Sequence, residues 1–432
     1  MRRLLRSPYD REIVRLAVPA LGALAAEPLY ILADTAIVGH LGTPQLAALA
    51  LAGALLSALA SLCNFLAYGV TAQVARLHGA GEEERAGAVA AQALWVALAI
   101  GVLVAGATVA FAGPAIALLG GDGHVGDLAT RFLRIGALGL PFALIALAGQ
   151  GYLRGISDLA SPLRILVAAN VLNVVLELVF VYGFDWGLDG SAWGTVVAQS
   201  AMGAAFVVLL LRAPARSRRP DAALIRPLLR MGGALVIRTG SLLAAFMLAG
   251  AVLARVGSAS LGAHQIGYQL FIFIAFVLDA IAIAGQVIVG RRLGAGDAAG
   301  ARAAARRMLE LSVAAGVAFG AVLMALRGLA PRAFSDDPDV LERARTLWPL
   351  LALMQPVGAA VFALDGILLG AGEAGYLAWS MLGALVVFAP IAVASLDWGI
   401  TGVWIGLNVL MLVRLITCGL RFAGGRWMRV GA

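Results

Sequence analysis

The run Gly79-Ala80-Gly81-Glu82 returns 215 residues later as Gly294-Ala295-Gly296-Asp297. Other landmarks recur at the same or nearly the same offset: Gly42 as Gly257, Pro141 as Pro356, Gly151 as Gly366, Gly155 as Gly370, and Asp185-Trp186-Gly187 as Asp397-Trp398-Gly399. In a chain of 432 residues, this pattern predicts a tandem duplication. We expect an N-terminal lobe at 1–215 and a C-terminal lobe at 216–432, joined by a basic loop at about 212–230.

The composition predicts a membrane protein. Hydrophobic residues make up 62% of the chain and charged residues only 13%, where a soluble domain has about 25%. Mean hydropathy is +0.94. The net charge of +8 does not indicate nucleic-acid binding, because the basic residues lie in short loops between apolar runs. Abundant Ala and Arg without Lys suggest a bacterial source.

Several classes of active site are excluded or disfavoured by residue usage. All 32 basic residues are Arg, so the chain lacks the Lys that a Walker A phosphate loop or a Schiff-base enzyme requires. Cys63 and Cys418 lie in apolar runs, and the four histidines show no metal-ligand spacing. We therefore expect no cofactor, and direct ATP drive would need a separate subunit.

Apolar runs divide the chain into candidate membrane spans, each long enough for the ~20 residues that a crossing helix needs. We expect twelve, at 11–38, 46–75, 86–112, 126–152, 162–183, 190–212, 226–255, 260–290, 300–327, 341–370, 375–396 and 400–422. The predicted fold is therefore an all-α polytopic membrane protein. Because each repeat has six spans, both repeats enter the membrane in the same orientation and are parallel.

The arginines predict the orientation. With the N-terminus inside, 23 of the 32 fall in the inside segments, Arg2, Arg3 and Arg6 among them. The positive-inside rule then places both termini in the cytoplasm, as in a multi-pass protein of a bacterial inner membrane. For the basic loop at 212–230, a topology signal is favoured over a patch for nucleic acid or anionic lipid.

Two glycine patterns are interpreted as structural. The Gly-Ala-Gly-acid turns resemble phosphate cradles only superficially, since a helix end followed by an acidic first turn explains them better. Gly151-x-x-x-Gly155 and Gly366-x-x-x-Gly370 are interpreted as close-packing sites between helices.

Acidic and amide side chains inside the spans indicate a functional site. A charge at mid-membrane costs at least ~2.5–3.5 kcal/mol, so each such acid needs a reason. The polar residues are Glu27 and Asp34 in the first span, Asn170, Asn173 and Glu177 in the fifth, Thr195 and Gln199 in the sixth, Asp279 in the eighth, and Asp365 in the tenth. Asn170, Asn173 and Glu177 share one face of a helix.

Simpler interpretations remain open for several of them. Asp34 lies toward the outer end of its span, where an acid can face water. Asn170 and Asn173 can equally make hydrogen bonds between helices. Asp279 is either a satisfied core acid or a gate in the second lobe. Asp365, next to the packing Gly366, can serve packing or transport.

The duplication supplies an internal control. The second-half counterparts of the first-half polar residues are apolar: Asp34 corresponds to Ala249, Thr195 to Leu407, Asn173 to Phe388 or Leu385, and Glu177 to Ala392 or Ala389, depending on the offset. The repeats share glycines, prolines and turns. The polar set therefore belongs to the first half alone, and the duplicated architecture does not require it.

The chain resembles the multidrug and toxic compound extrusion (MATE) family, most closely its DinF-like branch. The resemblance rests on two six-helix repeats, the segment EPLYILADTAIVGHLG at 27–42, the Gly-Ala-Gly turns and the paired Asp-Trp-Gly turns. It implies a V-shaped bundle of two lobes that exports amphipathic, often cationic organic compounds in antiport with protons or sodium.

The resemblance also implies a coupling site. The family pattern of an Asp on helix 1, an Asn and an acid on helix 5 and a Thr on helix 6 matches Asp34, Asn173, Glu177 and Thr195, which would also hold sodium. The helix 5 acid is more often Asp, so Glu177 is one methylene longer than the pattern. Glu27, Asn170, Gln199, Asp279 and Asp365 are further candidates for cation or substrate contact.

Other functions were weighed against this one. A lipid-linked oligosaccharide flippase of the same superfamily would need a larger, Arg-lined cavity, and only Arg238 is a plausible intramembrane base. A membrane enzyme would need a catalytic cluster, but the one dense acidic group, Asp336, Asp337 and Asp339, is interpreted as a helix cap and solvated loop. A channel is disfavoured because no filter-like polar ring recurs. We expect a monomer in the lipid bilayer that acts on small organic substrates and not on nucleic acid, and we do not expect an enzyme.

Overall fold

In the computed structural model, which describes residues 7–431, all regular structure is helical. The α-helices are α1 (Pro8–Gly39), α2 (Thr43–Cys63), α3 (Phe65–Gly79), α4 (Glu83–Leu118), α5 (Gly123–Ala137), α6 (Leu140–Gly155), α7 (Ala160–Leu178), α8 (Gly187–Arg212), α9 (Ala222–Val256), α10 (Ser258–Gly294), α11 (Ala298–Ala325), α12 (Pro338–Gly370) and α13 (Ala374–Ala423). A π-helical turn, η1 (Val179–Gly183), follows α7, and a 3₁₀ turn, η2 (Pro331–Ala333), precedes α12.

The predicted membrane fold is confirmed. Within the described residues, ten helical segments are long and apolar enough to cross a membrane, and the bent pair α5 and α6 adds an eleventh. The 50-residue α13 bends at Gly399, where φ is 63°, and so contains the last two predicted spans. Arg2, Arg3 and Arg6, which contributed to the predicted orientation, lie outside the described residues.

Two predicted spans of the first half are not continuous helices. The span at 46–75 is interrupted at Asn64, which separates α2 from α3. The span at 126–152 bends by 47° between α5 and α6. The bend lies beside Pro141, which has no N–H to donate to the preceding turn, so the regular ladder of hydrogen bonds is interrupted there.

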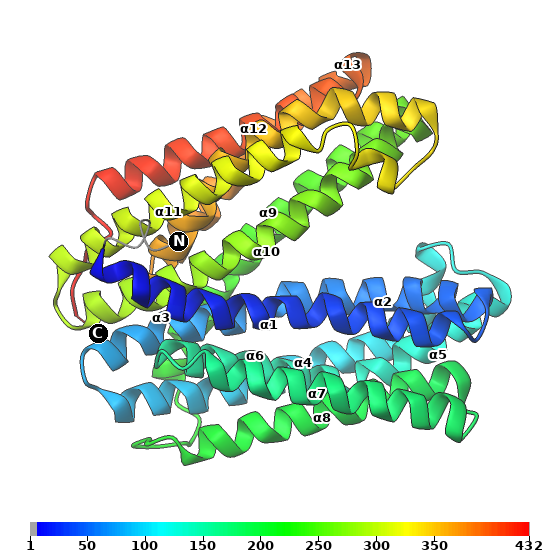
Figure 1. Cartoon of the computed structure of the whole chain (residues 1–432). Coiled ribbons are helices and arrows are strands. Elements are labelled where there is room, and N and C mark those ends of the chain that lie inside the picture. Colours follow the sequence, from blue (N-terminus) through cyan, green and yellow to red (C-terminus); the bar gives the residue numbers. More distant parts are fainter. Residues whose placement is uncertain (1–6, 432) are drawn as a thin grey trace. The chain divides into compact units, whose positions relative to one another are not determined.

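The contacts divide the chain into two compact units. The N-unit comprises Gly22–Gly232, and the C-unit comprises the residues up to Leu21 together with those from Gly233 onward. Figure 1 shows the helices of each unit lying side by side, with α1 in blue and α13 in red. The first turns of α1 are therefore part of the C-unit, and the first turns of α9 are part of the N-unit.

The duplication recurs in the packing. A Cβ at Gly151 would lie 2.7 Å from the carbonyl oxygen of Ala67, and Gly366 makes the same close approach to Ala282, 215 residues later. Glycine is required at both positions because two helix backbones approach too closely for a side chain. The predicted role of both Gly-x-x-x-Gly motifs in helix packing is thus confirmed.

The turns also recur, and they end helices as predicted. Gly81 has φ 75° and Gly296 has φ 78°, the left-handed conformation that glycine adopts after a helix. Asp297 then caps α11 by accepting a hydrogen bond from Gly300 N at 2.7 Å. This backbone N–H, together with the Arg292 guanidinium, lowers the pKa of Asp297 from its usual value.

Candidate functional site

The candidate site is built where α7, the π-turn and α8 meet. A Cβ at Gly190 would lie 2.8 Å from the backbone carbon of Phe180, and one at Gly194 would lie 3.1 Å from Glu177 Cγ. These two glycines let α8 approach α7 closely. As a result, the α8 residues Ser191 and Thr195 lie beside the end of α7. A π-turn at this point is typical of functional sites in helices.

Two carboxyl groups lie together in this region. Asp34 on α1 is 6% exposed and Glu177 on α7 is fully buried. The two groups are close enough to interact electrostatically. Ser191 Oγ donates a hydrogen bond to Asp34 Oδ1 at 2.7 Å. Asp34 is thus buried among helices and bonded to α8, which favours a role in the site over that of an exposed acid at a helix end.

Thr195 connects the other polar groups of the site. Its hydroxyl donates to Glu177 Oε1 at 3.5 Å, and it accepts from Asn173 Nδ2 at 3.2 Å. The hydroxyl of Tyr30 lies 3.0 Å from Thr195 Oγ1. Since the single proton of Thr195 goes to Glu177, Tyr30 must be the donor in that contact. The four residues predicted to form a coupling site therefore lie together in the N-unit.

The electrostatics of the pair are unusual for buried acids. Among the described residues, no ion pair neutralises Asp34 or Glu177. No hydrogen-bond donor reaches the buried Glu177 Oε2, and the buried Asn173 Oδ1 also has no partner. Two carboxylates cannot both remain ionised in such surroundings without a cation, because burial and their mutual repulsion both disfavour the charged forms. The arrangement can therefore hold a proton, or a cation that prefers oxygen ligands.

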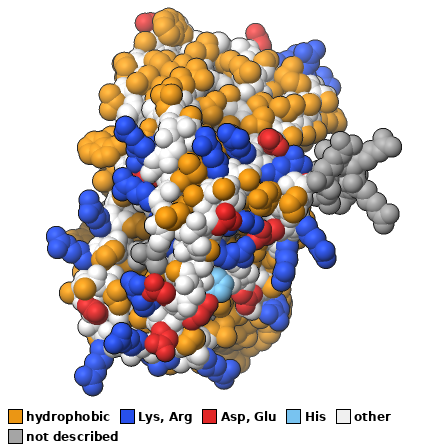
Figure 2. All heavy atoms as spheres, turned by 90° about the vertical axis from the view of Figure 1, so that its left-hand side faces the viewer, with side chains coloured by type: hydrophobic (Ala, Val, Ile, Leu, Met, Phe, Trp, Pro, Cys, Tyr) orange, Lys and Arg blue, Asp and Glu red, His pale blue; other side chains and the backbone are white. Residues whose placement is uncertain are grey.

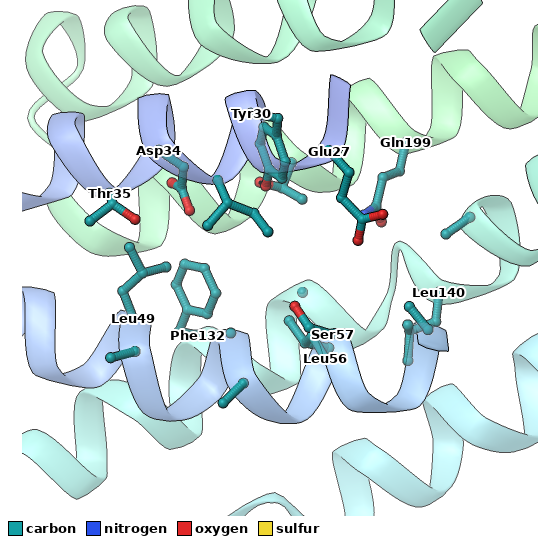
Figure 3. A pocket seen from close by; sticks show the side chains of 18 of the residues that line it. Glu27, Tyr30, Asp34, Thr35, Leu49, Leu56, Ser57, Phe132, Leu140 and Gln199 are labelled. Atoms are coloured by element: carbon teal, nitrogen blue, oxygen red, sulfur yellow. The ribbon is translucent and has the colours of Figure 1, made fainter. Parts of the chain in front are cut away.

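A cavity of about 390 Å³ opens beside the pair within the N-unit. Figure 3 shows the side chains of Glu27, Tyr30 and Asp34 along α1, facing Leu56 and Ser57 of α2 across this space. A second cavity of about 190 Å³ shares part of the lining and reaches Asn173. A small organic molecule in the first cavity would thus lie against the same helix that carries Asp34.

Comparison with known proteins identifies the fold family. A family model described as MatE matches residues 19–179 and 239–394, which is more than half of the chain. The chain belongs to the MatE family. Its members are transporters and not enzymes, and they act on small organic substrates in a membrane.

Relatives place this MATE protein more closely. It is 32% identical to Protein DETOXIFICATION 44, chloroplastic, of Arabidopsis thaliana over 94% of this chain and 80% of that protein. It is 29% identical to DNA damage-inducible protein F of Escherichia coli (strain K12) over 94% and 90%. A solved structure, an "outward-facing conformation of a multidrug resistance MATE family transporter", has a TM-score of 0.86, 21% identity and 98% coverage of both chains. The predicted DinF-like MATE membership is confirmed.

The remaining candidates in the N-unit of the MATE protein have different surroundings. Glu27 and Gln199 line both cavities, and Gln199 Oε1 is buried without a hydrogen-bond partner. Asn170 donates to the backbone carbonyl of Ala26 at 2.9 Å. Its contact is therefore an interhelical hydrogen bond from α7 to the backbone of α1.

Asp279 and Asp365 belong to the C-unit. Asp365 is buried and binds two arginines: Arg414 Nη2 at 2.6 and 2.8 Å, and Arg238 Nη2 at 2.5 Å. The prediction that Arg238 is the only intramembrane base is therefore wrong, because Arg414 is a second one. Arg414 on α13 is 2% exposed. It is a single Arg in a long apolar run, so the sequence does not indicate that its partner is Asp365. Asp279 lies on α10 and is partly buried.

Two residues of the site were not predicted from the sequence. Tyr30 lies four residues before Asp34 on α1, and Ser191 lies four residues before Thr195 on α8. Residues four apart share a helix face, so this spacing was a usable signal. The spacing alone does not single out Tyr30 and Ser191, because an aromatic or hydroxyl side chain in an apolar helix is usually a packing residue.

Proposed function

We propose that the chain exports amphipathic, often cationic organic compounds in exchange for protons or sodium ions. The observation that supports this most strongly is the buried pair Asp34 and Glu177, which has neutral partners and no arginine. Such a pair must exchange a cation with its surroundings to avoid two buried negative charges. Neutral oxygens from Asn173 and Thr195 complete a set of ligands that suits sodium as well as a proton.

In this proposal the cation controls the cavity through α1. Cation binding removes charge from the N-unit and lets α1 shift at Pro19 or Pro28, which closes the cavity and releases substrate. One charge that enters down the membrane potential supplies ~2.3 kcal/mol per 100 mV, which drives efflux. The halves 1–215 and 216–432 act as the two lobes of the transport cycle.

The proposal includes a cellular setting. The arginine distribution supports both termini in the cytoplasm. The abundant Ala and Arg without Lys support a bacterial inner membrane, and a monomer is proposed as the working form. The flippase alternative gains no support from the structure. Arg238 and Arg414 both bind Asp365 and line neither cavity of the N-unit.

Reconstituted protein tests the coupling site. Asp34→Asn should abolish cation-driven substrate counterflow, because the amide can neither bind a proton nor balance a sodium charge. Asp127→Asn, at an exposed position on α5, is the matched control and should transport like the wild type. Full activity of Asp34→Asn would refute the assignment.

The coupling ion is identified in the same vesicles. Efflux of a cationic dye is measured with a sodium gradient alone and with a proton gradient alone. A protonophore that stops efflux, with no effect of sodium, identifies proton coupling. Persistence of efflux under a sodium gradient in the presence of the protonophore identifies sodium.

A further inference from the structure

The segment between α8 and α9 is a fixed surface of the N-unit and not a loose tether. Gln92 on α4 holds it at two points: Nε2 donates to Arg219 O at 2.9 Å, and Oε1 accepts from Asp221 N at 2.9 Å. Trp95, one turn further along α4, donates from Nε1 to Arg218 O at 2.9 Å. The backbone of the segment is thus bonded to a membrane-spanning helix.

Close packing fixes the start of the same segment. A Cβ at Gly87 would collide with the carbonyl oxygen of Pro214, so the segment lies directly on the backbone of α4. Arg218 also donates to the carbonyl oxygens of Leu211 and Ala213 at 2.8 and 2.9 Å, which satisfies the end of α8. One arginine of the segment therefore has a structural role.

The other arginines of this region remain exposed to solvent. Arg212, Arg216, Arg219, Arg226 and Arg230 are all exposed, and no ion pair is recorded for any of them within the described residues. The only acid between 212 and 230 is Asp221, whose Oδ1 accepts a hydrogen bond from Ala223 N at 2.8 Å. Figure 2 faces the end of the molecule that carries this segment and shows basic side chains projecting from it.

Two of these arginines border an apolar hollow. Arg226 and Arg230, one turn apart on α9, line a shallow depression with Ile225 and Leu229. Leu229 is 47% exposed and Trp95 is 45% exposed, although both lie close to where spans leave the membrane. Guanidinium groups beside exposed apolar side chains at a membrane surface match the two parts of a lipid, a charged headgroup and a fatty chain.

We propose that this surface binds an anionic phospholipid of the surrounding bilayer, with its phosphate at Arg226 and Arg230. A topology signal needs only positive charge near a span. Such a signal does not require that the segment's backbone be bonded to Gln92 and Trp95, or that Gly87 let the segment lie on α4. The lipid comes from the bilayer because α8 ends and α9 begins at this segment. In the orientation proposed above, it belongs to the cytoplasmic leaflet.

Binding of phosphatidylglycerol to the purified full-length chain tests the inference. Retention of this lipid over phosphatidylethanolamine is measured by native mass spectrometry after release from mixed bilayers. Arg226→Gln/Arg230→Gln should weaken retention about thirtyfold, which corresponds to about 1 kcal/mol for each arginine at an anionic surface. The matched control is Arg302→Gln/Arg306→Gln, which removes two arginines with the same spacing near the start of α11 and should change retention less than about twofold.

A second variant keeps every charge and hence the topology signal. Gln92→Leu should release the segment and weaken phosphatidylglycerol retention severalfold. Equal losses of phosphatidylglycerol retention in the two double variants would show that general surface charge holds the lipid, and would overturn the proposal. Unchanged retention in Gln92→Leu would likewise overturn the role of the fixed segment. Full displacement of the lipid by inorganic phosphate would show a site for free anions and not for a lipid.

Discussion

Thr195 has one hydroxyl proton and three polar neighbours. Because it can donate to only one of them, the other two must donate to it. It donates to Glu177, accepts from Asn173, and leaves Tyr30 as a further donor. Asn173 and Tyr30 thus both donate to Thr195, and of the three only Thr195 donates to a carboxyl oxygen of Glu177. This order makes the hydroxyl of Thr195 the link between α1, α7 and α8.

Tyr30→Phe tests this link at the level of one atom. The ring stays in place and only the donor to Thr195 is lost, at a cost of about 1 kcal/mol. We expect cation affinity, measured from the cation dependence of efflux, to fall about fivefold. Tyr182→Phe is the control, because Tyr182 bonds to the carbonyl of Ile37 outside the carboxyl pair. Equal effects of the two variants would contradict the role of Thr195.

At the level of elements, the approach of α8 to α7 decides whether the site exists. Gly190 and Gly194 permit this approach, and their repeat counterparts Gly402 and Gly406 also lie in close contacts. The second half thus keeps the glycines without the polar residues. Close packing belongs to the duplicated fold, and the carboxyl pair is an addition to it in one half.

Gly194→Ala should disturb the carboxyl site and leave the overall fold intact. The new methyl group would lie 3.1 Å from Glu177 Cγ, and overpacking of this kind costs about 1–3 kcal/mol. We expect cation-driven efflux to fall about tenfold while the protein still folds and inserts. Gly250→Ala on α9 is the control, since no atom lies within 4 Å of the added Cβ. Normal efflux in Gly194→Ala would show that the approach of α8 is not critical.

Over the whole molecule, the two halves of the duplication have diverged in helix continuity and in charge. The first half is interrupted at Asn64 and bent at the α5–α6 junction, whereas its counterparts α10 and α12 are each one helix. Both cavities beside the carboxyl pair are lined by the interrupted helices. Within residues 7–431, the buried carboxyl pair of the first half has no arginine partner, whereas Asp365 of the second half is bound by two arginines.

An Asp→Asn substitution should therefore affect stability differently in the two halves. Asp365→Asn leaves the guanidinium groups of Arg238 and Arg414 without their carboxylate and should lower the free energy of unfolding by about 3–5 kcal/mol. Asp34→Asn removes an acid that no arginine balances and should leave stability unchanged or raise it. Thermal unfolding in detergent measures both. A large loss of stability in Asp34→Asn would contradict this contrast.

Much of the fold could be predicted because it rests on signals that lie close together in the sequence. Apolar runs of sufficient length, with glycines and prolines between them, gave the spans and the repeat. The interruption at Asn64 could not be predicted, because a single Asn in an apolar run is usually accommodated within a helix. The partner of Arg414 is also distant in sequence, so only the packed structure shows it.

The candidate site was predicted in part. Asp34, Asn173, Glu177 and Thr195 were selected where the repeats differ and where the family pattern matches, and the structure brings them together. Tyr30 and Ser191 were missed because their side chains have an ordinary packing interpretation. Asn170 shares the helix face of Glu177, yet its hydrogen bond goes to the α1 backbone, and periodicity cannot distinguish the two environments.

The boundaries of the two units have a consequence for each half of the chain. Each half contributes the first turns of its own first helix to the other unit, α1 to the C-unit and α9 to the N-unit. Asp10, for example, is fully buried and forms an ion pair with Arg307 of α11. A six-helix half on its own would lack these contacts. Each half of the chain therefore needs residues of the other half to pack the first turns of its own first helix.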